Sequence, residues 1–220
     1  MERIPEEELM TEPAHVQAYA NADFSEPHNA FVTQFGEQFS GFFEAFDVLD
    51  LGCGAADISL RFARAYPACR LVGIDGSEVM LTLGRECIRQ AGLQDRIRLS
   101  KRLLPVVKAD SIFDVIISNS LLHHLVNPAV LWQAVQQFGK SGSKIFIMDL
   151  LRPDSQRQAE TLVNKYAKHE HPLLKKDFFN SLCAAYRVNE VQGQLERAGL
   201  STLSVSSTSD RHLVVTGCLP

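Results

Sequence analysis

Four short apolar segments, separated by helical patterns, limit what this chain can fold into more than any other feature of it. Each segment is rich in Val, Ile, Leu or Phe without strict alternation, which is typical of strands buried on both faces of a parallel sheet. The predicted strands are Asp47–Leu51, Arg70–Ile74, Phe113–Ser118 and Ile145–Met148. Parallel strands that alternate with helices need right-handed crossovers, so we predict an α/β fold with a doubly wound sheet and helices on both faces.

The segments between these strands carry the signals that start and stop helices. A proline follows the apolar pattern of Ile58–Tyr66 and ends it. The side chain of Ser77 can cap Glu78–Ala91, and Asn127-Pro128 places a cap and then a proline before Ala129–Phe138. Three helices are therefore expected within the alternating part of the chain.

The two ends of the chain depart from this alternation. Helices are predicted at Ala14–Ala20 and Pro27–Phe39 before the first strand, and at Glu160–Lys168 and Val191–Ala198 after the fourth. Two further predicted strands, Leu203–Ser206 and His212–Thr216, are joined by a short turn. A closing hairpin of this kind adds one antiparallel strand to the end of a parallel sheet.

Composition narrows the class of function. The net charge of −4 leaves no excess of base to neutralise phosphates, so no nucleic-acid partner is expected. The N-terminus is acidic where a secretory signal would be basic, and no apolar run reaches the roughly 18 residues of a membrane span. No membrane partner is therefore expected. Five widely spaced cysteines without a Cys-x-x-Cys pair favour a cytoplasmic protein with reduced thiols and without disulfides or a zinc site, so no metal is expected.

A glycine-rich turn follows the first predicted strand. Gly52-Cys53-Gly54 would let the backbone turn tightly and approach a ligand closely, at the edge where open α/β sheets bind nucleotides. The third glycine of the dinucleotide fingerprint is replaced by Asp57. A carboxylate there would repel a pyrophosphate, which disfavours NAD and FAD but not an adenosyl ligand without phosphates.

A carboxylate stands at the end of the second predicted strand. Asp75 follows Gly54 by 21 residues, the spacing at which an acidic side chain accepts hydrogen bonds from ribose hydroxyls. Either motif alone more often marks a structural turn. Together, on neighbouring strand ends, they predict an adenosine-binding site.

The chain resembles class I S-adenosylmethionine-dependent methyltransferases over about residues 47–150. The resemblance rests on Leu49-Asp50-Leu51-Gly52-Cys53-Gly54, on Gly73-Ile74-Asp75, and on the fourth strand and its exit, from Phe113 through Ser118-Asn119 to His123-His124-Leu125. It implies a seven-stranded, mostly parallel sheet with an antiparallel last strand, and S-adenosyl-L-methionine as the cofactor.

The resemblance also implies roles for individual positions in the cofactor site. The expected cofactor-binding residues are Gly52, Cys53 and Gly54 at the methionine part, Asp50 beneath its amino group, Asp75 with Gly76 at the ribose, and Ser118 with Asn119 at the sulfonium side. One departure concerns the adenine. Members of this family often carry an acidic residue before Leu104-Pro105, but this chain has Ser100-Lys101-Arg102-Leu103, so the adenine edge is expected to be recognised by backbone.

Two adjacent histidines follow the strand that should face the methyl group. An imidazole with a pKa near neutrality can take a proton from the acceptor or bind a metal, which makes His123 and His124 the catalytic candidates. The alternative is that His123 only packs or caps the turn before Asn127.

Acceptor contacts are expected from segments outside the alternating core. The candidates are Tyr19 and His28 in the N-terminal helices, which in this fold commonly close over the site, and Asp177 and Tyr186 in the insert, where a loop is predicted around Asp177. Phe178 and Phe179 are expected to attach the insert to the sheet, with a place in the pocket wall as the alternative. Arg211-His212 are expected at the surface, with the mouth of the pocket as the alternative. We predict one domain over residues 1–220: a helical lid (1–45), a cofactor-binding core (46–150), an insert (151–190) and a final helix with hairpin (191–220).

The function predicted is methyl transfer from S-adenosylmethionine to a small-molecule acceptor. No Asn/Asp-Pro-Pro-Tyr motif follows the fourth strand, which argues against methylation of exocyclic amines of nucleic-acid bases. Three alternatives stay open: a non-catalytic S-adenosylmethionine-binding module, an enzyme of this fold that modifies the cofactor or transfers another group, and a tRNA or protein methyltransferase. The acceptor atom and the oligomeric state are not specified by the sequence.

Overall fold

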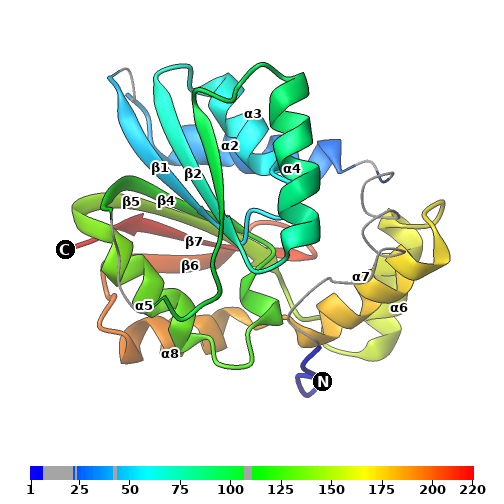
Figure 1. Cartoon of the computed structure of the whole chain (residues 1–220). Coiled ribbons are helices and arrows are strands. Elements are labelled where there is room, and N and C mark those ends of the chain that lie inside the picture. The colour runs from blue at the N-terminus through cyan, green and yellow to red at the C-terminus, as the bar shows by residue number, and fades with distance from the viewer. Residues whose placement is uncertain (7–21, 23, 42–43, 107–110) are drawn as a thin grey trace.

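A seven-stranded sheet forms the centre of the computed structural model, which describes residues 1–6, 22, 24–41, 44–106 and 111–220 (Figure 1). The strands are β1 (Phe46–Leu51), β2 (Cys69–Asp75), β3 (Ile97–Lys101), β4 (Phe113–Asn119), β5 (Gly139–Leu150), β6 (Leu203–Ser207) and β7 (His212–Cys218). Their order across the sheet is β3-β2-β1-β4-β5-β7-β6.

The pairing confirms the predicted topology. Strands β3, β2, β1, β4 and β5 run parallel, whereas β7 is antiparallel to both of its neighbours, β5 and β6. The chain leaves β1 toward β2 on one side, and β4 lies on the other side. The loops after β1 and β4 therefore diverge, and such a switch point opens a crevice at the carboxyl ends of the strands.

Every apolar segment predicted to be a strand is a strand in the structure, and one further strand was not predicted. All six strands predicted from the sequence are present, but β3 was not predicted. It lies at the edge of the sheet, where Arg98, Ser100 and Lys101 interrupt the apolar pattern. The edge position explains the miss, because an edge strand is not buried on both faces.

Seven α-helices and one 3-10 turn are assigned within the described residues. They are α2 (Ser25–Gln38), α3 (Asp57–Ala65), α4 (Glu78–Gln90), η1 (Leu122–His124), α5 (Ala129–Phe138), α6 (Gln156–Tyr166), α7 (Pro172–Ala184) and α8 (Val188–Arg197). The predicted cap of α4 is present, since the Ser77 hydroxyl accepts a hydrogen bond from Met80 N at 3.4 Å. The loop predicted around Asp177 is wrong: these residues belong to α7.

Helices cover both faces of the sheet, as predicted. Phe31 and Phe35 of α2 and Phe62 of α3 are fully buried on one face, and Trp132 of α5 and Leu195 of α8 are buried on the other. Alternate residues of the central strands supply the two cores, because successive side chains of a strand point to opposite faces. Helices α6 and α7 pack on each other beside the sheet and form a third, smaller core (Figure 1).

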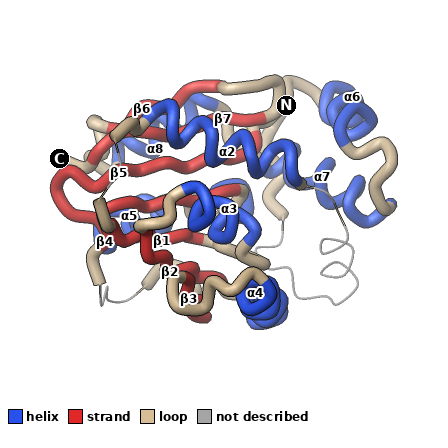
Figure 2. The backbone as a smooth tube through the Cα atoms, turned by 90° about the horizontal axis from the view of Figure 1, so that it is seen from above, coloured by secondary structure: helices blue, strands red, loops and turns tan. Residues whose placement is uncertain are grey.

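Of the two helices predicted before the first strand, one falls within the described residues. The predicted helix Ala14–Ala20 lies outside the described residues, whereas the second predicted helix is present as α2. Helix α2 lies across the sheet with Phe31 and Phe35 inward, so most of its length belongs to the core (Figure 2). No helix in the described ranges has both the length and the apolar character that crossing a membrane requires.

Candidate functional site

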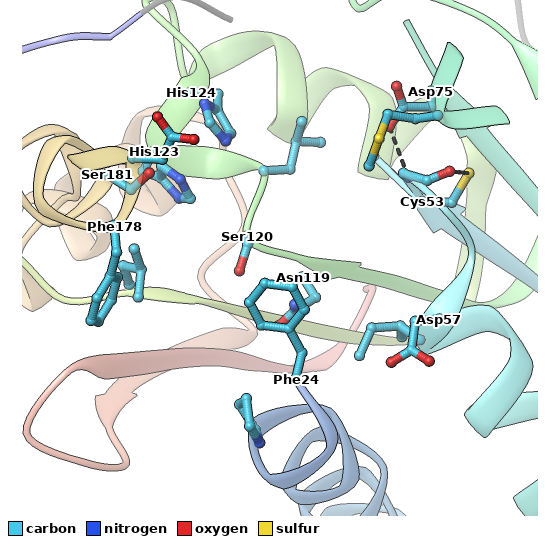
Figure 3. Close-up of a pocket in the computed structure, with 18 of the residues that line it drawn as sticks. Phe24, Cys53, Asp57, Asp75, Asn119, Ser120, His123, His124, Phe178 and Ser181 are labelled. Carbon is cyan, nitrogen blue, oxygen red and sulfur yellow. Dashed lines mark hydrogen bonds between the residues drawn. The ribbon is translucent and has the colours of Figure 1, made fainter. Parts of the chain in front are cut away.

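A cleft of about 1110 Å³ opens at the carboxyl edge of the parallel strands (Figure 3). Ligand pockets usually measure about 300–1,000 Å³, so the cleft is at the large end of the usual range. Figure 3 shows Cys53 and Asp75 on one side of the cleft and His123, His124 and Phe178 on the other. We call these two sides the glycine-loop end and the histidine end.

The glycine loop is fixed to the neighbouring strand through its backbone. The amides of Gly52 and Cys53 donate to Ile74 O at 2.9 and 3.0 Å, and the amide of Gly54 donates to Asp75 Oδ2 at 2.9 Å. Gly52 has a φ of +71°, and a Cβ there would lie 2.9 Å from the Leu121 side chain. Only glycine fits such a position, so the sequence forces the backbone close to the cleft.

Asp75 closes the loop from the end of β2. Its carboxylate accepts backbone hydrogen bonds from Gly54, Gly76 and Ser77, the last at 2.7 Å. Burial raises the pKa of Asp75 above its usual range, although these amides oppose the rise. A carboxylate offers about four acceptor sites, so capacity for a ribose hydroxyl is left.

Asp50 is a second carboxylate beneath the loop. It is 1% exposed, accepts a hydrogen bond from the Ser59 hydroxyl at 2.5 Å, and still contributes to the wall of the cleft. Burial raises the pKa of Asp50 to about 7. A cationic ligand group beside it would favour its ionised form and gain from the pairing.

Asp57, which replaces the third glycine, begins α3 at the margin of the cleft. Partial burial would raise its pKa, but hydrogen bonds from His28 and Arg61 lower the pKa of Asp57 to about 2. His28 comes from α2, lines the cleft, and uses its Nδ1 for this contact. An ionised carboxylate there disfavours a pyrophosphate, as the sequence suggested.

The exit of β4 separates the two ends of the cleft (Figure 3). Asn119 and Ser120 line the cleft, and Ser120 has a φ of 56°, which non-glycine residues seldom adopt. Ser118 lies behind the wall rather than in it. Its side chain is fully buried, and its hydroxyl donates to Leu51 O at 2.7 Å, so it joins β4 to β1.

At the histidine end, η1 presents His123 and His124. His123 is 2% exposed, and its Nδ1 lies 2.6 Å from Asp149 Oδ1. Burial alone would lower the pKa of His123, but the negative charges of Asp149 and Glu6 raise it above its usual range. The imidazole is therefore oriented by a carboxylate that the sequence analysis did not select.

Of the two insert residues predicted to contact the acceptor, one lines the cleft in the structure. Asp177 of α7 lines the cleft, and so does Phe178, which had been expected only to pack. Tyr186 is not among the described residues that line it. The hydroxyl of Tyr186 donates to Leu125 O at 3.0 Å, and Arg3 stacks on its ring at 4.2 Å. Tyr19 lies outside the described residues.

Four residues of the histidine end were missed or misplaced from sequence. Arg211 and His212, expected at the surface, line the cleft, and burial together with Arg211 lowers the pKa of His212 to about 4. Asp149 could have been found, because it follows a predicted strand at the carboxyl edge of the sheet. Nothing in the sequence pattern pointed to Glu6.

Comparisons with known proteins agree with this geometry. A family profile described as a methyltransferase domain matches residues 43–199. A ubiquinone biosynthesis O-methyltransferase of Azoarcus sp. (strain BH72) is 31% identical over 105 residues, which are 48% of this chain and 44% of that protein. A demethylmenaquinone methyltransferase of Listeria welshimeri is 26% identical over 136 residues, 61% of this chain and 57% of the relative. The chain thus spans about half the length of the curated relatives it matches.

Solved structures share the fold. A SAM dependent methyltransferase from Aquifex aeolicus superposes with a TM-score of 0.69 at 18% identity, covering 96% of this chain and all of the other. The plantazolicin methyltransferase BpumL in complex with SAH gives a TM-score of 0.71 at 15% identity, with 95% and 91% of the two chains covered. Similarity at this level of identity establishes a common architecture.

Proposed function

We propose that this chain, which belongs to the methyltransferase domain family and uses S-adenosylmethionine, methylates a small molecule held at the histidine end of its cleft. One observation carries the proposal. A single cleft runs from the glycine loop and Asp75 to His123, which Asp149 orients. A donor bound at one end and an acceptor bound at the other would share one cavity, as transfer requires.

The glycine-loop end fits the cofactor. The backbone of Gly52, Cys53 and Gly54 would hold its methionine part, with Asp50 beside the amino group and Asn119 toward the sulfur. Asp75 and Gly76 would hold the ribose. When bound, S-adenosylmethionine supplies a methyl group activated by a positively charged sulfur. The chain's own contribution is to fix the position of the donor and to pair its cationic amino group with the buried carboxylate of Asp50.

The histidine end suits an aromatic acceptor that bears an oxygen. Phe178, Asp177 and Tyr166 of the insert line the cleft with two rings and a carboxylate, and Phe24, His28 and His212 line it as well. The matched relatives named for ubiquinone and menaquinone biosynthesis support this class. Such an acceptor must lose its proton before or during transfer. His123 and His124 can assist by accepting the proton or by holding a metal that acidifies the acceptor.

Binding and turnover test the proposal separately. Calorimetry should detect S-adenosylhomocysteine, and mass spectrometry should detect methylated product with some member of a panel of phenols and quinols. His124→Ala should lower kcat by about 100-fold, the usual size of proton-transfer assistance, with little change in S-adenosylhomocysteine affinity. His169→Ala, at an exposed histidine, is the matched control.

Two results would contradict this function. Preference for NAD over S-adenosylhomocysteine would remove the cofactor assignment. Methylation of tRNA or protein, with none of the small molecules accepted, would remove the acceptor assignment.

A further inference from the structure

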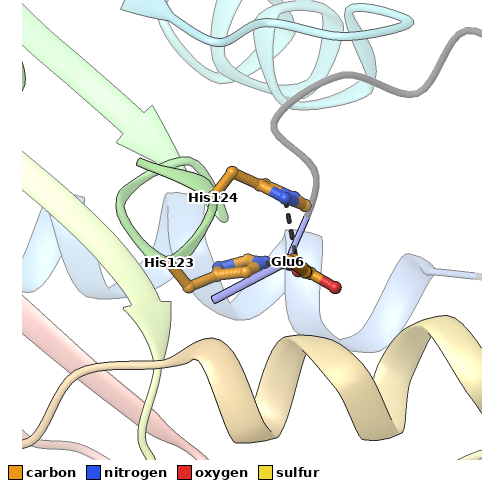
Figure 4. Close-up of side chains that lie close together, drawn as sticks. All are labelled: Glu6, His123 and His124. Carbon is orange, nitrogen blue, oxygen red and sulfur yellow. Dashed lines mark ion pairs between the residues drawn. The ribbon is translucent and has the colours of Figure 1, made fainter. Parts of the chain in front are cut away.

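Three metal-ligating side chains meet at the histidine end of the cleft: Glu6, His123 and His124 (Figure 4). Their candidate donor atoms all lie within 4.8 Å of one another. Glu6 Oε1 is 3.5 Å from Nε2 of His123 and 3.2 Å from Nδ1 of His124. Two imidazoles and one carboxylate thus converge on one point, and all three residues line the cleft.

The separations between these atoms fit a shared ion better than direct hydrogen bonds. A charge-assisted N–H···O bond usually measures about 2.7–2.9 Å. Both distances to Glu6 are longer. Metal–nitrogen and metal–oxygen bonds to zinc are about 2.0–2.2 Å, so two ligands of a tetrahedral ion lie about 3.3–3.6 Å apart. The two observed separations, 3.2 and 3.5 Å, fall close to this range.

The groups behind the cluster are arranged as metal sites require. A metal-binding histidine almost always donates its second ring N–H to a carboxylate, which fixes the tautomer and aims the other nitrogen at the ion. In this chain the carboxylate is that of Asp149, whose Oδ1 lies 2.6 Å from Nδ1 of His123. Asp149 is itself held by the amides of Leu122 and Leu150, at 2.7 and 2.6 Å.

Hydrogen bonds also fix the position of Glu6. Ser181 donates to its Oε1 at 2.8 Å, and ligating carboxylates are normally hydrogen-bonded in this way. The chain before it is fixed to α7 and η1: Ile4 N donates to Cys183 O, and the Arg3 guanidinium donates to Ala184 O and His123 O. These contacts bring the carboxylate from the start of the chain to the histidines.

We infer that Glu6, His123 and His124 bind one divalent transition-metal ion, with its remaining coordination positions open to the cleft. Two histidines and a carboxylate with an open position form a recurrent ligand set for zinc and for other first-row metals. Magnesium and calcium prefer oxygen ligands, so the two nitrogens select against them.

An ion at this position could also be coordinated by the acceptor. Its open positions face the same cavity as the acceptor, so an acceptor oxygen can complete the coordination and become more acidic there. This link to the acceptor rests on the proposed function. The binding of the ion itself does not.

Cobalt(II) provides a spectroscopic probe of the site. Protein freed of metal with a chelator should take up one Co²⁺ with visible d–d absorption and without a sulfur-to-cobalt band in the near ultraviolet. Zn²⁺ should displace it in competition. Glu6→Gln and His124→Ala should each raise the dissociation constant by at least about 10- to 100-fold, since even the loss of a supporting hydrogen bond costs that much.

Matched variants separate these ligands from their neighbours. Glu2→Gln makes the same change four residues earlier at an exposed position, and His169→Ala removes an exposed histidine from another loop. Both should bind Co²⁺ as the wild type does. Circular dichroism of each variant confirms that it is folded.

Several outcomes would overturn the inference. They are no uptake of Co²⁺ or Zn²⁺ by the wild type, uptake that survives both Glu6→Gln and His124→Ala, and a sulfur-to-cobalt band that places the ion on a cysteine. Calorimetry with S-adenosylhomocysteine on the metal-free protein tests the cofactor site independently. Failure of that binding, with Co²⁺ uptake intact, would count against the proposed function and not against the metal site.

Discussion

The two ends of the cleft are built in opposite ways. At the glycine-loop end, two short stretches, residues 50–57 and 75–77, contribute to the lining of the cleft, and backbone amides hold the carboxylate of Asp75. At the histidine end, side chains converge from five segments, among them residues 1–6 and 211–212. One end is a local motif on a rigid sheet edge, and the other is assembled by tertiary packing. Substitutions should therefore separate cofactor affinity from the handling of the acceptor.

The largest effect is expected at Gly54. Gly54→Val should abolish detectable binding of S-adenosylhomocysteine in calorimetry, because the added methyl groups would enter the cleft beside Met80. Gly54 has a φ of +51°, so the substitution should also lower the free energy of unfolding by about 1–2 kcal/mol.

Gly92→Val is the matched control for this strain. Gly92 has a φ of +67°, and a Cβ there would meet nothing within 4 Å. The two variants should lose similar stability, and only the first should lose the ligand. Equal affinity in both would mean that the loop does not contact the cofactor.

A smaller loss of S-adenosylhomocysteine affinity is expected from substitution of Asp75. Asp75→Asn should weaken S-adenosylhomocysteine binding by about 1.5–3 kcal/mol, roughly 10- to 150-fold, because a charged acceptor of ribose hydroxyls is lost. Asp114→Asn is the control, since Asp114 also accepts a backbone hydrogen bond, from Asp47 N at 2.9 Å, but near the start of β4. A similar loss in both variants would show a general effect on the sheet.

Asp50 predicts a pH dependence at the same end. The pKa of Asp50 is about 7 in the folded chain, against an ordinary aspartate value of 3.8, so the folded chain holds an extra proton between these pH values. The free energy of unfolding should therefore fall as pH rises from about 4 to 7, by a few kcal/mol at most, and level off above. Urea unfolding at several pH values should show this slope in the wild type and lose it in Asp50→Asn.

Cofactor affinity should change in the opposite sense. The cationic amino group of S-adenosylhomocysteine favours the ionised Asp50, so binding should weaken by about tenfold between pH 7.5 and pH 6. Calorimetry in buffers of different ionisation enthalpy should report proton release near pH 6. Affinity that is flat over this range would contradict the contact.

The smallest effect on the ligand is expected at Ser118. Ser118→Ala should leave S-adenosylhomocysteine affinity unchanged and lower the free energy of unfolding by about 1 kcal/mol, because the Ser118 hydroxyl is buried behind the cleft and donates a hydrogen bond to Leu51 O. Calorimetry and urea unfolding measure the two quantities. Loss of affinity as large as that in Asp75→Asn would return Ser118 to the cofactor site.

The features predicted correctly from the sequence are those set by residues close to one another in the chain. The strand pattern, the glycine turn and the spacing to Asp75 are local, and they led to the doubly wound sheet and to the glycine-loop end of the cleft. Ser118 and Asn119 mark the limit of such reasoning. One step along a strand turns a side chain to the other face, and only Asn119 meets the cleft.

The histidine end could not be derived in this way. Ser181 and Glu6, which share a hydrogen bond, are 175 residues apart, and no periodicity encodes their meeting. Around Asp177, polar and aromatic residues are mixed without a clean apolar stripe, so a loop was predicted where α7 forms. Only packing decides such elements.

The third hydrophobic core, formed by α6 and α7, should let the histidine end of the cleft open independently of the sheet. Leu162 of α6 and Leu182 of α7 are buried in a cluster that shares few residues with the sheet, Leu150 among them. Such a cluster can open as one cooperative unit at a cost well below that of global unfolding. Amide hydrogens of α6 and α7 should exchange with solvent earlier than those of β1 and β4. The α6–α7 wall of the cleft would then open locally while the glycine loop keeps its conformation.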